Sequence, residues 1–171
     1  MKTATDKAGE PRAPGVGFDS LFDDCYESMK RLAFLLGADD PENIAQEAFV
    51  RLHTRWSSLV DADKATAYLR RTVVNLSRSR LRHLRVARRA PREPDRDMAS
   101  AESLALANQG VWDALATLTH RQRQVLVLRY WLDLDQQAIA DTLGVAVGTV
   151  KATTNHAMAA LRSALAGEED R

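Results

Sequence analysis

Apolar residues recur at three- and four-residue spacing along most of this chain, which is the periodicity of an amphipathic α-helix. The first such run starts at Phe18 and ends at Gly37, a residue type that often terminates helices in the left-handed conformation. Its apolar positions are Leu21, Phe22, Cys25, Met29, Leu32 and Leu36. Later runs show the same spacing, so the pattern predicts an all-α fold.

A second helix is expected to begin at Pro41, which suits the first helical turn, with Asp40 before it as the capping residue. Its buried face would consist of Ile44, Ala45, Ala48, Phe49 and Leu52. The outer face then carries Gln46, Glu47 and Arg51. These polar side chains form either an ordinary solvated surface or a contact surface for a partner.

A third helix is expected to begin near Ala65 and to run to Arg89. Its apolar side contains Leu69, Val73, Leu76 and Leu84. The other side presents a stripe roughly 80° wide, made of Arg71, Asn75, Arg78, Arg82, Arg85 and Arg89. Arginines gathered without an acid repel one another, and a phosphate backbone would neutralise them while releasing counterions. The stripe therefore favours nucleic-acid binding over a solubilising surface, in which the two signs of charge are usually mixed.

Residues 90–103 contain Pro91 and Pro94 and few apolar residues, so they are expected to form a flexible linker. Helical periodicity returns at Leu104. A further helix is then expected over residues 120–134, with Thr119 as its cap. Its Val125, Leu126, Leu128 and Trp131 would fill a small core.

The most informative stretch runs from Asp135 to Leu161 and predicts two helices around a sharp corner. Asp135 can cap the first helix, and Gly144 suits the turn that ends it. Ala140 is small where the two helices would cross, and Val150 would pack the second helix onto the first. A small residue, a glycine four later and an aliphatic residue six after that are typical of a DNA-binding helix-turn-helix. The alternative is an ordinary helical hairpin.

These elements divide the chain into two small helical domains, residues 18–89 and 104–166, joined by the linker 90–103, with tails at 1–17 and 167–171. The single cysteine, Cys25, excludes an internal disulfide, and the four histidines show no metal-ligand spacing. No cofactor or metal is therefore expected. The N-terminus lacks the apolar core of a signal peptide, and no apolar run reaches membrane-spanning length, so a soluble cytoplasmic protein is expected.

The net charge of +1 conceals a strong asymmetry along the chain. Residues 18–63 carry a net charge of −6, residues 64–92 carry +10 with no acid at all, and residues 93–171 carry −4. Affinity for nucleic acid should therefore concentrate in the middle block.

Taken together, these patterns resemble the extracytoplasmic-function sigma factors of bacterial RNA polymerase, within the sigma-70 superfamily, and most of all their actinobacterial SigE-like branch. The likeness is carried by NIAQEAFVRLHTRW (43–56), AYLRRTVVNLSRSRLRHLRVARR (67–89), RQRQVLVLRYWLDL (121–134) and IADTLGVAVGTVKATTNHAMAALR (139–162). Four motifs in the right order, covering about residues 18–166, are more specific than a helix-turn-helix alone. The resemblance implies a non-enzymatic function in promoter-specific transcription initiation.

The resemblance also implies roles by position. The polymerase core would be bound through its β′ clamp by Asn43, Gln46 and Glu47, and through its β flap by the second domain. The −10 element would be bound and opened by the loop from Ser57 to Thr66 and by Arg71, Asn75, Arg78, Arg82 and Arg85. The −35 element would be read by Gly148, Thr149, Lys151, Thr153, Asn155 and His156, with backbone N–H groups of Gly148 and Thr149 offered to a phosphate. Promoter DNA and an anti-sigma factor are the other partners that the family implies.

Several positions depart from the family pattern. Asn43 stands where relatives usually have Asp, and Asp135 with Ala138 replaces a usual Ser and Glu capping pair. In the reading helix, Ala152, Thr153, Asn155 and His156 occupy positions where Ser, Arg or His is common. The preferred −35 sequence therefore does not carry over.

Two other functions fit parts of the pattern. A stand-alone helix-turn-helix transcriptional regulator would share the corner but would need neither the Gln46–Glu47 surface nor the arginine stripe. An enzyme would need a nucleophile–base pair, a glycine-rich phosphate loop or a metal cluster, and the sequence contains none of these.

Overall fold

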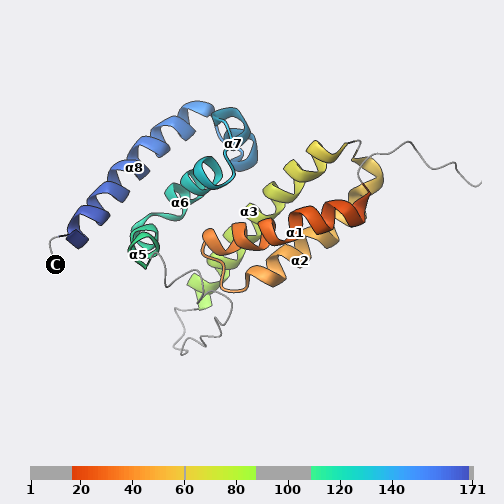
Figure 1. The fold of residues 1–171 in the computed structure, drawn as a ribbon, viewed down its shortest axis with the longest axis horizontal. Helices are drawn as coiled ribbons and strands as arrows, with labels where there is room; N and C mark the ends of the chain where they lie inside the picture. The colour runs from red at the N-terminus through yellow and green to blue at the C-terminus, as the bar shows by residue number, and fades with distance from the viewer. Residues whose placement is uncertain (1–16, 60, 88–108, 170–171) are drawn as a thin grey trace, which may run out of the picture.

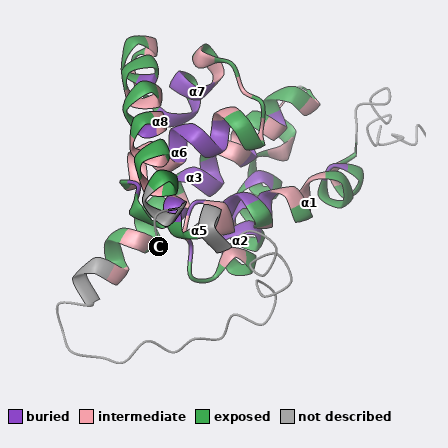
Figure 2. Cartoon of the chain, turned by 60° about the vertical axis from the view of Figure 1, so that its left-hand side comes forward, coloured by how far each residue is buried: buried purple, intermediate pink, exposed green. Residues whose placement is uncertain are grey.

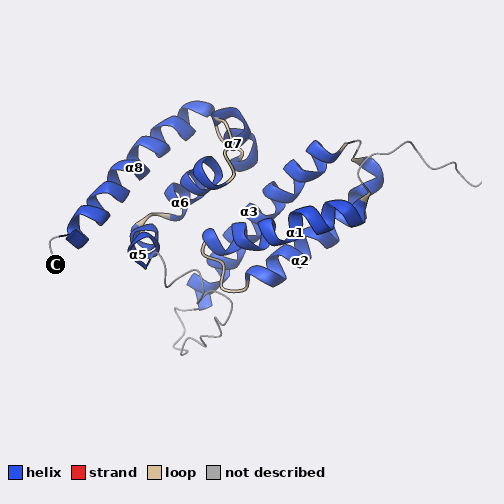
Figure 3. Cartoon of the chain, viewed as in Figure 1, coloured by secondary structure: helices blue, strands red, loops and turns tan. Residues whose placement is uncertain are grey.

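The computed structural model describes residues 17–59, 61–87 and 109–169, and all of their regular structure is helical (Figures 1 and 3). The prediction of an all-α fold is therefore confirmed. The described residues form a first half, residues 17–87, and a second half, residues 109–169. The whole of the expected linker, residues 90–103, and all but Gly17 of the expected N-terminal tail lie outside the described residues, and the exact domain boundaries stay predictions.

The first two helices begin and end where the sequence predicts. Helix α1 (Phe18–Leu35) is followed by Gly37 at φ +85°, the left-handed region that glycine enters without steric cost. Helix α2 (Pro41–Arg55) begins after Asp40, whose carboxylate accepts a hydrogen bond from the Asn43 N–H at 3.1 Å. The five apolar positions expected on the inner face of α2 are all buried.

Helix α3 (Ala62–Ala87) starts three residues earlier than expected. Asp61 explains the difference, because its carboxylate accepts the Lys64 N–H at 2.8 Å and so caps the helix. A 3₁₀ turn over Trp56–Ser58 precedes it. The loop expected from Ser57 to Thr66 is consequently shorter in the structure.

Helix α3 is buried over a wide arc that covers two of its sides. Leu69 and Val73 face the first half, as the periodicity predicts, and are fully buried. Val74 lies roughly 100° further around the helix than Val73, with Ser77 between them, and both are also buried, at 1% and 0% exposure. This second buried side was not expected from the sequence, and it is the side toward α7 (Gln136–Leu143), against which α3 packs.

The second half begins with α5 (Gln109–Thr117) and α6 (His120–Leu126). Thr119 caps α6 in a capping box, because its hydroxyl accepts the Gln122 N–H while its own N–H donates to the Gln122 side chain. The helix expected over residues 120–134 stops early: it continues only as a π-helical turn, Val127–Trp131. Asp133 at φ +50° then reverses the chain, which α-helical backbone could not do.

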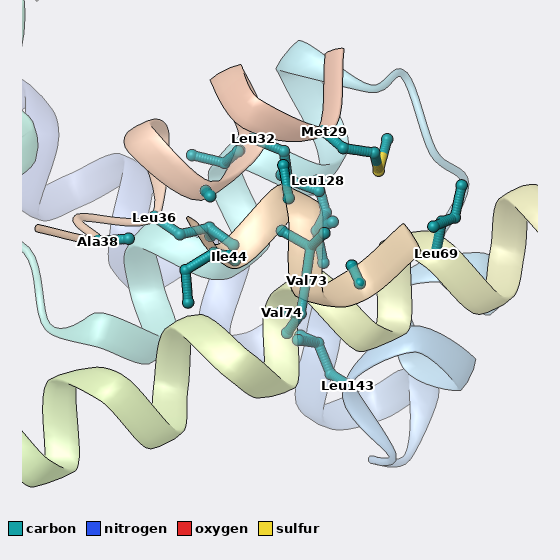
Figure 4. Packing of buried hydrophobic residues seen from close by; sticks show 14 of the residues in the cluster. Met29, Leu32, Leu36, Ala38, Ile44, Leu69, Val73, Val74, Leu128 and Leu143 are labelled. Atoms are coloured by element: carbon teal, nitrogen blue, oxygen red, sulfur yellow. The ribbon is translucent and has the colours of Figure 1, made fainter. Parts of the chain in front are cut away.

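Most of the core is shared by the two halves. One apolar cluster joins buried residues of α1, α2 and α3 to Val125, Leu128, Ile139, Leu143 and Val150 of the second half. Figure 2 shows buried residues gathered where α3, α6 and α7 meet, and Figure 4 shows Leu128 among residues of the first half.

A separate small core of the second half was expected to contain Val125, Leu126, Leu128 and Trp131, and that prediction is wrong in two respects. Val125 and Leu128 belong to the shared cluster, while Leu126 packs with Leu118 and Ala157 in a smaller one. Trp131 is 43% exposed, because the π-helical turn rotates it out of the interior.

One ion pair fixes α3 to the connection between α1 and α2. The Arg80 guanidinium donates to both carboxylate oxygens of Asp39, with Nε 2.9 Å from Oδ1 and a terminal nitrogen 3.0 Å from Oδ2. This hydrogen bonding lowers the pKa of the Asp39 carboxyl below its usual 3.8. Arg80 is therefore paired with a carboxylate inside the protein.

Asp39→Asn should lower the free energy of unfolding at neutral pH by up to about 1 kcal/mol, because both side chains remain partly exposed and solvent screens the pair. The folded-state pKa is depressed, so this contribution is present above the unfolded value of about 3.9 and disappears as pH falls through the lower folded value. Urea denaturation of both proteins from pH 7 to pH 2.5 measures this difference. A gap between them that persists at the lowest pH would contradict the assignment.

Candidate nucleic-acid and protein interfaces

The corner between α7 and α8 (Val147–Glu169) has the geometry of a helix-turn-helix. The Asp135 carboxylate accepts the Ala138 N–H at 2.7 Å and caps α7. Gly144 adopts φ +66° and its N–H donates to Ala140 O, which ends the helix. Ala140 and Val150 are buried at 2% and 0% exposure where the helices cross. The spacing of Ala140, Gly144 and Val150 therefore predicts correctly where the two helices cross and where the first one ends.

The outer face of α8 carries most of the residues expected to read DNA. Gly148, Thr149, Lys151, Asn155 and His156 are exposed. Thr153 is half-buried, so it offers less of its side chain to a ligand. The Thr149 N–H donates to Ala146 O at 3.0 Å, which leaves the hydroxyl of Thr149, rather than its N–H, for a phosphate.

Arg162 is a basic residue of this face that the sequence reasoning missed. It is exposed, and at 100° per residue it lies in line with Lys151 and Asn155 along α8. Its position seven residues after Asn155, two helical turns along the same face, is the sequence feature that could have identified it. Arg123 of α6, in contrast, is half-buried: its Nε donates to Leu115 O at 3.0 Å, and burial lowers the pKa of its guanidinium.

The arginine stripe of α3 faces solvent. Arg71, Asn75, Arg78 and Arg82 are exposed, and an Arg78 guanidinium nitrogen donates to Asn75 Oδ1 at 3.2 Å. Arg85 lies within α3, but its side chain is outside the part that the structure describes, as is that of Arg89. The stripe occupies the third side of a helix whose other two sides are buried, so packing fixes its direction.

The outer face of α2 presents Asn43 and Gln46 to solvent. Glu47 is partly exposed and forms an ion pair with Arg51, one turn later. Val50 is 63% exposed on the same side, one turn after Gln46, and was not expected to belong to this surface. An apolar residue between polar ones gives the face the mixed character of a protein-contact surface.

The remaining surface feature is an apolar groove between described residues of both halves. The groove has a volume of about 340 Å³ and is lined by Leu35, Leu115, Leu126, Val127, Tyr130, Trp131, Met158 and Leu161. No group of three or more potential metal ligands occurs among the described residues. Across residues 17–59, 61–87 and 109–169, none of the helices combines the length and apolarity that crossing a membrane requires.

Comparison with known proteins gives matches that span both halves. The family model of sigma-70 region 4 matches residues 109–161. The RNA polymerase sigma-E factor of Streptomyces avermitilis is 34% identical over 128 residues, covering 74% of this chain and 71% of the relative. The ECF RNA polymerase sigma factor SigM of Mycobacterium tuberculosis is 34% identical over 152 residues, covering 84% of this chain and 74% of that protein.

A solved structure shares the fold. The sigma factor RpoE of Bartonella quintana, crystallised with the anti-sigma factor NepR, aligns over 86% of this chain and 96% of its own, with a TM-score of 0.70 and 19% identity. At that level of identity the likeness concerns the arrangement of helices alone.

Gly144→Ala should reduce the free energy of unfolding by about 1 kcal/mol, because a residue with a Cβ is strained in the left-handed region even where, as here, no neighbouring atom is close. Gly148→Ala is the matched control, since Gly148 lies in open space at an ordinary φ. It should leave stability unchanged or raise it by about 0.5 kcal/mol. Urea denaturation measures both, and equal responses at the two glycines would contradict the role of Gly144 as a helix terminator.

Proposed function

This chain belongs to the extracytoplasmic-function sigma factors of the sigma-70 family, which are non-catalytic subunits of RNA polymerase, and we propose that it directs polymerase to promoters by binding the core enzyme, the −10 element and the −35 element. The observation that carries this proposal is the fixed, exposed arginine stripe of α3 on the same chain as a well-formed helix-turn-helix.

At the −10 element, the stripe would hold the phosphate backbone while strands separate. Arg71, Arg78 and Arg82 each offer a charged fork that suits phosphate oxygens. Asn75 lies at the edge of the stripe, where its amide could hydrogen-bond an unstacked base or a phosphate. Arg85 continues the stripe by position along the helix. No covalent chemistry is needed, because strand opening is driven by the sum of many such contacts.

At the −35 element, the outer face of α8 would enter the major groove. Lys151 and Asn155 can read guanine and adenine edges, and His156 and Thr153 flank them. Gly148 and Thr149 lie at the start of the helix, where a phosphate is favoured by the helix dipole. Lys151 and Arg162 are the fixed positive charges on this face, so binding at this element would be weak unless polymerase and α3 hold the chain nearby.

Core polymerase would be bound by the outer face of α2 through Asn43, Gln46 and Glu47, with Val50 adding apolar contact. This surface would face the β′ clamp, and the second half would face the β flap. Action on polymerase implies a cytoplasmic protein. An anti-sigma factor is a proposed further partner, since the Bartonella quintana structure of the same fold contains one. A stand-alone regulator is disfavoured, because the relatives match both halves of the chain.

Gln46→Ala combined with Glu47→Ala should weaken binding to core polymerase about tenfold or more while the protein stays folded, because both side chains point away from the core. Arg51→Ala is the control: it also breaks the Glu47–Arg51 ion pair but keeps both proposed contacts. Fluorescence anisotropy with labelled protein and core polymerase measures the affinity. Unchanged affinity in the folded double variant would remove the assignment to the clamp.

Arg78→Ala combined with Arg82→Ala should leave core binding intact and impair promoter opening, because two phosphate contacts are lost. Permanganate footprinting of melted thymines at roughly 0.15 M salt measures opening. Lys30→Ala with Arg55→Ala is the matched control, since it removes the same charge from the partly exposed Lys30 and the exposed Arg55, elsewhere in the first half. Equal footprints for both double variants would count against the stripe as the −10 surface.

A further inference from the structure

Val50, on the outer face of α2, is exposed in a way that neither its helix nor the core explains. Its side chain is 63% exposed, against 36% for Leu165, the other exposed large aliphatic residue in the part of the chain that the structure describes. A β-branched residue also has a lower helix propensity than alanine, leucine or the long charged residues. Single exposed apolar residues are common, so the surroundings of Val50 decide whether it belongs to a binding surface.

Uncharged polar side chains surround Val50. At 100° per residue, Asn43, Gln46 and Thr54 lie within roughly 40° of it around α2, and all three are exposed. The amides of Asn43 and Gln46 carry both donors and acceptors, so they can hydrogen-bond a partner whatever its charge. The Thr54 hydroxyl donates to Arg51 O at 2.8 Å and is already satisfied within the helix. An apolar side chain ringed by neutral hydrogen-bonding groups is typical of a binding hot spot.

The charged side chains next to this ring are paired within the protein. Glu47 forms an ion pair with Arg51, one turn later on α2. On α1, Lys30 Nζ lies 2.8 Å from a carboxylate oxygen of Glu27. This hydrogen bond raises the pKa of the lysine, and the nearby charge of Glu42 on α2 adds to the effect. Acids and bases therefore neutralise one another here, and the surface around Val50 is close to neutral.

We propose that Val50 is the apolar anchor of the core-binding face, and that the part of polymerase it contacts is uncharged and offers an apolar recess. The inference rests on the proposed function, because polymerase is the partner assigned to this face of α2. A charged partner surface would lose water against Val50 without gaining an ion pair, since the nearby acids and bases already pair with one another. Nucleic acid does not fit this face, because it lacks the excess of basic side chains that the stripe of α3 offers to phosphates.

Two variants of opposite charge, Val50→Glu and Val50→Lys, test the chemistry of the partner surface. Both should weaken binding to core polymerase at least about tenfold, by factors that agree within about threefold, because either charge would be buried without a partner. The two losses should also be the same at roughly 0.1 M and roughly 0.4 M salt. Each full-length variant competes with fluorescently labelled parent protein for core polymerase, and anisotropy measures the displacement.

Conservative substitutions separate an anchor from a merely structural residue. Val50→Ile keeps an apolar side chain and should bind core polymerase within about twofold of the parent. Val50→Ala removes two methyl groups and Val50→Thr replaces one by a hydroxyl, so each should weaken binding about fivefold. Ser20→Glu and Ser20→Lys are the matched controls, since they place the same charges at an exposed position of α1 outside this face. Both controls should bind like the parent, and circular dichroism should show the parent's helical content in every variant.

The outcomes separate this inference from the proposed function. A parent protein that fails to bind core polymerase overturns both. If the parent binds and the Val50 variants all bind equally well, Val50 is no anchor and the inference alone fails. It also fails if Val50→Glu and Val50→Lys differ by more than about threefold at low salt and converge at high salt, because the partner surface is then charged. Equal losses at Ser20 and Val50 overturn it too, since the effect then does not belong to this face.

Discussion

Helix α3 is covered on two sides and open on the third, and the rest of the structure depends on that division. Leu69 and Val73 anchor it to α1 and α2, while Val74 and Ser77 face the helix-turn-helix. Two buried faces leave one direction for the arginine stripe, so the same packing that joins the halves also orients the charge. Each fully buried aliphatic side chain on these faces contributes roughly 1.5–3 kcal/mol, which far exceeds the repulsion among exposed arginines. Hydrophobic burial therefore determines how α3 packs, and this packing sets the direction in which its arginines point.

Local chemistry at helix ends sets the positions from which this packing starts. Asp40, Asp61 and Asp135 each accept a backbone N–H three residues later, and Gly37 and Gly144 end the helices before the turns. The three capping aspartates lie at the N-termini of their helices, where the helix dipole favours negative charge. Three acids of the first half are thereby engaged within the protein, Asp40 and Asp61 as caps and Asp39 in the pair with Arg80. The acidic and basic segments of the sequence therefore have different roles in the structure: acids cap helices or pair with Arg80, and arginines of α3 form the exposed stripe.

Function in this family requires no reacting groups, so the free energy available is the sum of many modest contacts to phosphates, bases and polymerase. Burial within the protein is itself a balance of opposing contributions. Apolar residues of both halves share one cluster, whereas Ser77 Oγ and Gln124 Nε2 are buried without a hydrogen-bond partner among the described residues, which reduces the net gain from burial. The apolar groove lies between the halves, since Leu35 comes from the first half and the other lining residues come from the second.

The sequence by itself determined the all-α fold, the capped starts of α2, α6 and α7, the glycine corner of the helix-turn-helix and the outward stripe of α3. These features depend on contacts within a few residues or on helical periodicity, which the sequence displays directly. Tertiary structure alone decided that Val74 is buried, that Trp131 turns outward, that Arg80 pairs with Asp39 while Arg123 is half-buried, and that Arg162 joins Lys151 on an exposed face. Periodicity can assign one buried side to a helix. It cannot reveal a second side covered by residues more than fifty positions away.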